Sequence, residues 1–62
     1  MKYKEFHRII QRNGWTVLPK KGKGSHMRYT KDGVIYTVPF HGSKEIDNSF
    51  AKAILKSMGI EL

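Results

Sequence analysis

Cysteine is absent from this chain of 62 residues. Disulfide bonds and thiolate metal ligands are therefore excluded, which is typical of proteins that work in a reducing cytoplasm. The three histidines do not form a His-x-x-x-His pair, the spacing that would present two imidazoles to a metal on one face of a helix. The sequence predicts a cytoplasmic protein that needs neither a metal nor another cofactor.

Long apolar runs are also absent. No stretch approaches the roughly 20 apolar residues that a membrane span requires, and no signal-peptide pattern opens the chain. The phosphate-binding Walker loop, the dinucleotide fingerprint and the nucleophile elbow are missing as well. We expect residues 1–62 to form one small soluble domain without a membrane partner.

Acidic residues are scarce in the first half of the chain. Residues 1–31 contain nine Lys or Arg residues and one acidic residue, whereas residues 32–62 contain three basic and four acidic residues. The whole chain carries a net charge of +7. Such a one-sided charge favours a polyanionic partner, although it also suits an acidic protein or mere solubility.

Apolar periodicity predicts two helices that flank a small sheet. Residues 2–13 have apolar side chains at helical spacing, and Gly14 is a suitable stop. The second helix begins at a cap, Asp47 or Asn48, and ends at Gly59. We place His7 on the exposed polar face of the first helix.

Three β-rich segments lie between the helices, at residues 15–18, 25–30 and 34–38. The last two are joined by Asp32-Gly33, a strong hairpin signal. The links are short, so the strands are expected to pair antiparallel. The predicted fold class is α+β, in the order α-β-β-β-α, with a three-stranded antiparallel sheet and both helices on one face.

Side chains alternate across a strand, and this alternation divides the sheet into a face that packs on the helices and a face that is open. Met27 and Tyr29 are predicted to face the helices, together with the apolar side of the third strand. His26 and Arg28 are then predicted to face outward. Trp15 and Tyr36 are expected in the core, because so small a domain needs its large apolar groups inside.

The segment from Lys20 to Tyr29 combines a flexible backbone, positive charge and an acid/base group. Lysines and glycines precede Ser25, and His26 follows at the start of a strand. Cations bind phosphate, and a histidine beside them can move a proton to or from a ribose 2′-hydroxyl. Residue chemistry alone leaves open whether His26 is catalytic or contacts a phosphate or base. The RNA-binding candidates are Lys21, Lys23, Gly24, Ser25 and Arg28.

His41, after Val38-Pro39-Phe40, has three interpretations: a second acid/base group, a phosphate contact, or a structural hydrogen-bonding residue. We rank the structural interpretation first.

Three segments in this order resemble the HicA toxins of bacterial HicA–HicB toxin–antitoxin pairs, and the resemblance covers nearly the whole chain. They are residues 23–26 (Lys-Gly-Ser-His), residues 37–41 (Thr-Val-Pro-Phe-His) and residues 50–60, from Phe50 to Ile60. The resemblance implies a fold similar to double-stranded-RNA-binding domains. It also implies a ribonuclease that cleaves mRNA and is neutralised by a HicB antitoxin. The functional histidine of the family falls on His26.

The resemblance and the residues together predict a metal-independent endoribonuclease toxin, monomeric when free, with His26 as its acid/base group. An antitoxin is expected to cover the active face. The first alternative is a non-catalytic RNA-binding module of the same fold, which keeps the cations but has no need of His26. The second alternative is an adaptor that binds only an acidic protein.

Overall fold

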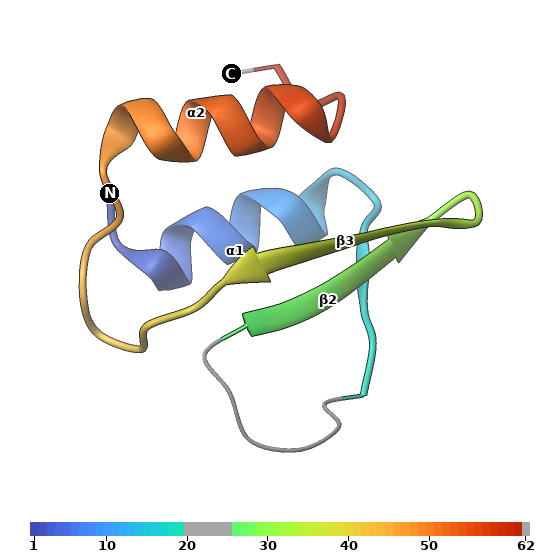
Figure 1. The fold of residues 1–62 in the computed structure, drawn as a ribbon, viewed down its shortest axis with the longest axis horizontal. Helices are drawn as coiled ribbons and strands as arrows, with labels where there is room; N and C mark the ends of the chain where they lie inside the picture. Colours follow the sequence, from blue (N-terminus) through green and yellow to red (C-terminus); the bar gives the residue numbers. More distant parts are fainter. Residues whose placement is uncertain (20–25, 62) are drawn as a thin grey trace.

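A computed structural model describes residues 1–19 and 26–61 of the chain. The elements follow in the order α1 (Tyr3–Arg12), β1 (Thr16–Val17), β2 (His26–Lys31), β3 (Val34–Pro39) and α2 (Asn48–Ser57) (Figure 1). The predicted order of helix, three strands and helix is confirmed. None of the helices in these residues is long and apolar enough to cross a membrane.

The sheet has the strand order β1-β2-β3, and both pairs of neighbours are antiparallel. The β2–β3 hairpin turns through Asp32 and Gly33, with φ angles of 51° and 81°. Positive φ at both positions is the geometry that matches a tight hairpin to the twist of its strands. The register that follows sets His26 opposite Pro39 and Arg28 opposite Thr37.

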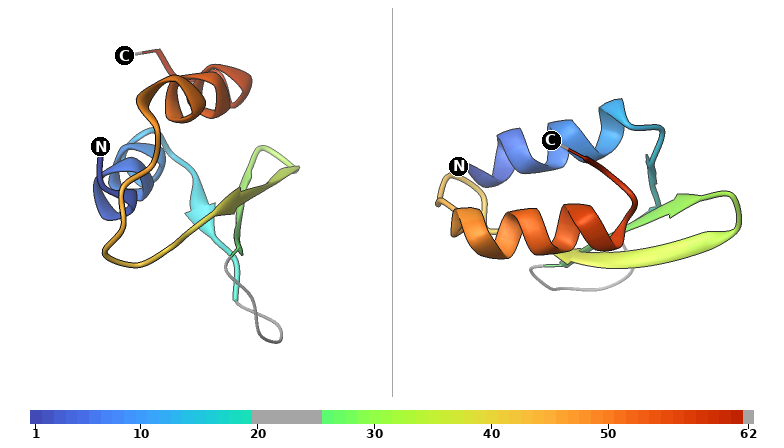
Figure 2. Two further views of the ribbon diagram at one scale, coloured as in Figure 1. Left: turned by 60° about the vertical axis from the view of Figure 1, so that its left-hand side comes forward. Right: turned by 90° about the horizontal axis from the view of Figure 1, so that it is seen from above.

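Both helices lie on one side of the sheet (Figure 2). The helix-facing residues Tyr29 and Val38 are completely buried there, as the alternation in β2 and β3 predicts. Of the two aromatic residues expected in the core, Trp15 is buried, and Tyr36 is half-buried and packs against it edge to face. The helices contribute two apolar stripes, Tyr3, Phe6 and Ile10 on α1 and Ala51 and Leu55 on α2, and the core is completed by Ile46, Met58 and Ile60.

Helix α2 begins and ends as its sequence predicts. The Asp47 carboxylate accepts a hydrogen bond from the Phe50 amide at 3.1 Å and so caps the first turn. Gly59, with a φ of 78°, ends the helix, and the chain then folds back so that Ile60 is buried. This return closes the core over the end of α2.

Helix α1 starts without a side-chain cap. Its first residues instead pair with the segment that follows β3, through an isolated bridge between Lys2 and Glu45. The Tyr3 amide donates to the Lys44 carbonyl at 3.2 Å, and the Ile46 amide donates to the Met1 carbonyl at 2.8 Å. The start of α1 is thereby joined to the connection between β3 and α2.

The prediction that His7 is a surface residue is wrong, because only 5% of its surface is exposed. Residues 3, 6, 7 and 10 share one face of a helix, so His7 belongs to the same buried stripe as its apolar neighbours. Burial removes water from the His7 ring, and hydrogen bonds to two protein groups take the place of those to water. Nδ1 lies 2.6 Å from the Tyr29 hydroxyl, and Nε2 lies 2.8 Å from the Pro39 carbonyl oxygen.

These contacts define one tautomer of His7. A carbonyl only accepts, so Nε2 carries the proton and donates to Pro39, and the Tyr29 hydroxyl donates to Nδ1. Gln11 donates to the Tyr29 oxygen at 3.4 Å. Burial lowers the pKa of His7, although its hydrogen bond to Pro39 acts in the opposite direction. Burial raises the pKa of Tyr29, against the opposing effect of the Gln11 hydrogen bond.

We predict that acidification destabilises the fold through His7. Its pKa in the folded protein lies below the unfolded value of about 6.5, so the unfolded chain binds the proton first. The stability that neutral His7 provides is fully present above that unfolded pKa and is lost as the pH falls through the folded pKa. Thermal unfolding should therefore move to lower temperature between about pH 7.5 and about pH 5.

His7→Gln and His41→Gln are the matched variants for this measurement. At neutral pH, His7→Gln should unfold at a lower temperature than the unchanged protein, because the buried ring and its contacts are lost. Between neutral and acidic pH, however, its unfolding temperature should fall by less than that of the unchanged protein. His41→Gln should keep the full loss, since His41 is exposed. Equal pH dependence in the unchanged protein and His7→Gln would contradict the assignment.

Candidate active site

His26 begins β2 and is exposed, on the sheet face away from the helices. The next residue, Met27, is half-buried on the helix side, and the alternation continues to the buried Tyr29. Opposite His26 lies Pro39, whose carbonyl accepts the hydrogen bond from buried His7. The strand pair that carries the exposed His26 is therefore held in place on its helix-facing side by the hydrogen bond from His7.

The outward face of the sheet is largely polar and has no acidic side chain among its described residues. The strand register places Arg28 beside Thr37, and Thr30 beside Ile35, which is 58% exposed. The Arg28 guanidinium donates to the Pro19 carbonyl at 3.3 Å, which holds it along the edge of the sheet. A cation two residues from an exposed histidine on one face is an arrangement suited to a phosphodiester.

His41 follows β3 by two residues and is exposed, so it belongs to the end of the sheet where His26 lies. Its ring packs edge-on against Tyr3, with centroids 5.1 Å apart. The His41 carbonyl accepts from the Lys44 amide at 3.1 Å. The hydrogen bond uses the backbone, which any residue at this position offers, so the role of the exposed His41 side chain stays a prediction.

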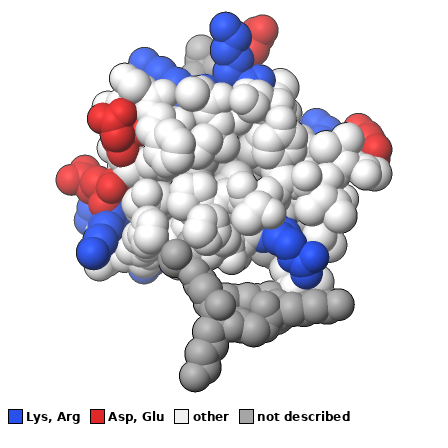
Figure 3. Space-filling model, viewed as in Figure 1, with Lys and Arg blue, Asp and Glu red and all other residues white. Residues whose placement is uncertain are grey.

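Most of the basic segment predicted to bind RNA falls outside the described residues. This applies to Lys21, Lys23, Gly24 and Ser25, and also to Lys20 and Gly22. On the face seen in Figure 3, the Lys and Arg side chains lie around the rim, and the centre is uncharged. Among residues 1–19 and 26–61, no group of three or more His, Asp or Glu side chains is placed to hold a metal ion.

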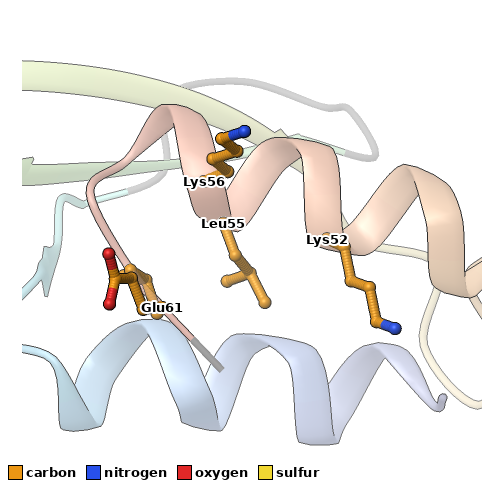
Figure 4. A pocket seen from close by; sticks show the side chains of 5 residues that line it. Lys52, Leu55, Lys56 and Glu61 are labelled. Carbon is orange, nitrogen blue, oxygen red and sulfur yellow. The ribbon is translucent and has the colours of Figure 1, made fainter.

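The hollows on the surface of the described chain include the following three. One, of about 410 Å³, lies along α2 between Lys52, Lys56 and Glu61, where Leu55 points toward α1 and Lys56 points away (Figure 4). A second lies between the hairpin and the end of α2 and includes Asp32. The third lies between α1 and β2, beside the strand that carries His26.

Sequence reasoning missed the third hollow. Lys4, Arg8 and Gln11 form part of its wall, and in the sequence they are ordinary polar positions of an amphipathic helix. The available signal was their spacing, because residues four and three apart share one face of a helix.

The described chain forms a helix, three antiparallel strands and a second helix. This small α+β architecture is consistent with a fold like that of double-stranded-RNA-binding domains. The family model described as "HicA toxin of bacterial toxin-antitoxin" matches residues 3–60, and the chain belongs to this family. It is 38% identical to a "Probable mRNA interferase HicA" from Pseudomonas fluorescens (strain Pf0-1), over 98% of each chain. No solved structure gives a significant match.

Proposed function

We propose that this protein is an endoribonuclease that cleaves mRNA and so inhibits translation as the toxin of a toxin–antitoxin pair. Membership of the HicA family and the name of the relative from Pseudomonas fluorescens support this function. The observation that carries it is the exposed His26 on an open sheet face, with Arg28 two residues away and no acidic side chain among the face's described residues.

His26 is the acid/base group in this proposal. Its neutral imidazole removes the proton from a ribose 2′-hydroxyl, and the 2′-oxygen attacks the adjacent phosphorus. The bond from phosphorus to the 5′-oxygen then breaks, leaving a 2′,3′-cyclic phosphate and a 5′-hydroxyl. Solvent supplies the proton for the leaving oxygen, or His41 supplies it from the same end of the sheet. No metal takes part in this sequence of steps.

Positive charge and backbone amides stabilise the transition state. Arg28 faces the same side as His26 and neutralises charge on the phosphate as the phosphorane forms. From the sequence, Lys21 and Lys23 add to this charge. The amide N–H groups at Gly24 and Ser25 donate to the phosphate oxygens, and the absence of a side chain at Gly24 allows the phosphate to come close. A single histidine provides acid/base catalysis of about 10²–10⁴-fold.

An antitoxin of the HicB type is the proposed protein partner. A basic active face attracts an acidic inhibitor over long range, and complementary charge speeds capture. In this arrangement the antitoxin presents carboxylates to Arg28, Lys21 and Lys23 and covers His26. Inhibition then results from occlusion of the RNA site.

We predict that His26→Ala lowers RNA cleavage by about 10²-fold or more and abolishes toxicity, while the fold is kept. The fold is expected to survive because the side chain is exposed and its removal leaves no cavity. Cleavage of a long RNA and circular dichroism, measured on the same purified variant, test both statements. Full residual cleavage would refute the catalytic role, and retained RNA binding by a wild-type protein that never cleaves would favour the non-catalytic module.

RNA affinity is predicted to fall steeply with salt. Each phosphate neutralised on a single strand contributes a slope of about −0.7 to the dependence of log affinity on log salt. Lys21→Ala, Lys23→Ala and Arg28→Ala should each reduce the slope, whereas Lys52→Ala, on α2, should not. Affinity that does not change across the salt series would instead support a protein ligand.

Binding of the antitoxin is predicted to protect the amides of β2 from hydrogen exchange, from His26 to Thr30. The measurement compares the free toxin with the purified complex, and RNA is added to the complex to test inhibition. Protection confined to the outer faces of the helices, with β2 as exchangeable as in the free toxin, would rule out occlusion.

A further inference from the structure

The hollow between α1 and β2 has a volume of about 340 Å³. That volume is at the lower end of the range of small-molecule sites and fits one nucleotide unit rather than a larger ligand. Helix α1 forms one wall, and β2 together with the residue after β3 forms the other. The lining residues are Lys4, His7, Arg8, Gln11, Met27, Tyr29 and Phe40.

The chemistry of the lining separates an apolar side from a charged side. Met27 and Phe40 are half-buried and offer apolar surface. Lys4 and Arg8 are exposed and lie four residues apart on α1, so their cationic groups emerge on the same side of the helix. Gln11, one turn further along, adds an amide that both donates and accepts. A flat apolar ring with an attached phosphate matches this division.

The apolar side of the hollow is held in place by the core. The Phe40 ring packs edge to face against the His7 ring, with centroids 4.9 Å apart. His7 is in turn fixed by its hydrogen bonds to Tyr29 and Pro39. A base entering the hollow therefore meets a surface that is already ordered, so little conformational entropy is lost on binding.

Charge distinguishes this hollow from the other two. The hollow along α2 includes Glu61 and the hollow beside the hairpin includes Asp32, whereas the described lining of the third contains two cations and no carboxylate. At the first two sites a carboxylate offsets the nearby lysines, Glu61 beside Lys52 and Lys56, and Asp32 beside Lys31. The third site suits a phosphate-bearing ligand.

The position of the hollow relates it to His26. Met27 lines the hollow and His26 precedes it in β2, so their side chains point to opposite faces about 3.3 Å apart along the strand. His26 and Met27 are the first two residues of β2, so the histidine and the hollow lie at the same end of the sheet, on opposite faces.

We propose that this hollow binds the nucleotide next to the cleaved phosphodiester. The base packs on Met27 and Phe40, Lys4 and Arg8 bind its phosphate, and Gln11 hydrogen-bonds to the edge of the base. The hollow thus sets which sequence around the scissile bond is bound. This proposal rests on the proposed ribonuclease function, because it assumes that RNA reaches His26.

Two double variants with equal loss of charge test the proposal. Lys4→Ala/Arg8→Ala removes the cations of the hollow, and Lys52→Ala/Lys56→Ala removes two exposed cations at the same spacing on α2. Each is made in a His26→Ala protein, and the probe is a short single-stranded RNA of mixed sequence at fixed salt. The RNA affinity of the first variant should be lower than that of the second by about 10-fold or more, because two contacts to phosphate are lost. Equal affinities would overturn the proposal.

A second measurement uses Gln11→Ala in the protein with intact His26. Mapping cleavage positions on a long RNA should show a changed sequence preference beside the cut, with total cleavage reduced less than by His26→Ala. Amide resonances of Gln11, Met27 and Phe40 in the His26→Ala protein should shift on addition of the short RNA. Unchanged preference together with unmoved resonances would overturn the subsite.

The outcomes separate this proposal from the ribonuclease function. If cleavage depends on His26 but not on Lys4, Arg8 or Gln11, the nucleotide subsite is refuted and the ribonuclease function stands. If the wild-type protein binds the short RNA through the hollow but cleaves no RNA, the ribonuclease function is refuted. The hollow would then still be a nucleotide-binding site, but not a subsite of a ribonuclease.

Discussion

The hydrogen-bonded imidazole of His7 is the interaction on which the arrangement of the protein depends. It lies in the apolar stripe of α1 and joins two different strands, through the Tyr29 hydroxyl on β2 and the Pro39 carbonyl at the end of β3. A polar ring in a core this small is tolerated only because both of its nitrogens are paired. Removing either partner leaves a buried polar atom unsatisfied, at a cost of about 1–3 kcal/mol.

This contact also connects the core to the candidate site. Pro39 is the register partner of His26, so the strand opposite the exposed histidine is tied to α1 from behind. The proposed nucleotide hollow shares the anchor, because Phe40 packs on the His7 ring. One histidine thus orders the helix side of the sheet, and another, with the opposite exposure, is available for chemistry on the open side.

The proposed RNA-binding features lie on two opposite faces of the sheet, near the start of β2. The open face contributes His26 and Arg28, and the α1 side contributes Lys4 and Arg8. The proposed division of labour has the open face act on the phosphodiester and the hollow select the neighbouring nucleotide.

The sequence by itself determined the order of elements, the Asp32-Gly33 hairpin, the start of α2 near Asp47 or Asn48 and the outward orientation of His26, because each follows from local backbone preference or strand alternation. It did not determine the environment of His7, since a histidine at a helical position suits either water or a core that supplies two partners. Those partners are 22 and 32 residues away in the chain. The hollow beside Met27 likewise exists only where α1 packs against β2. Contacts between distant segments decided both features, and no local pattern encodes them.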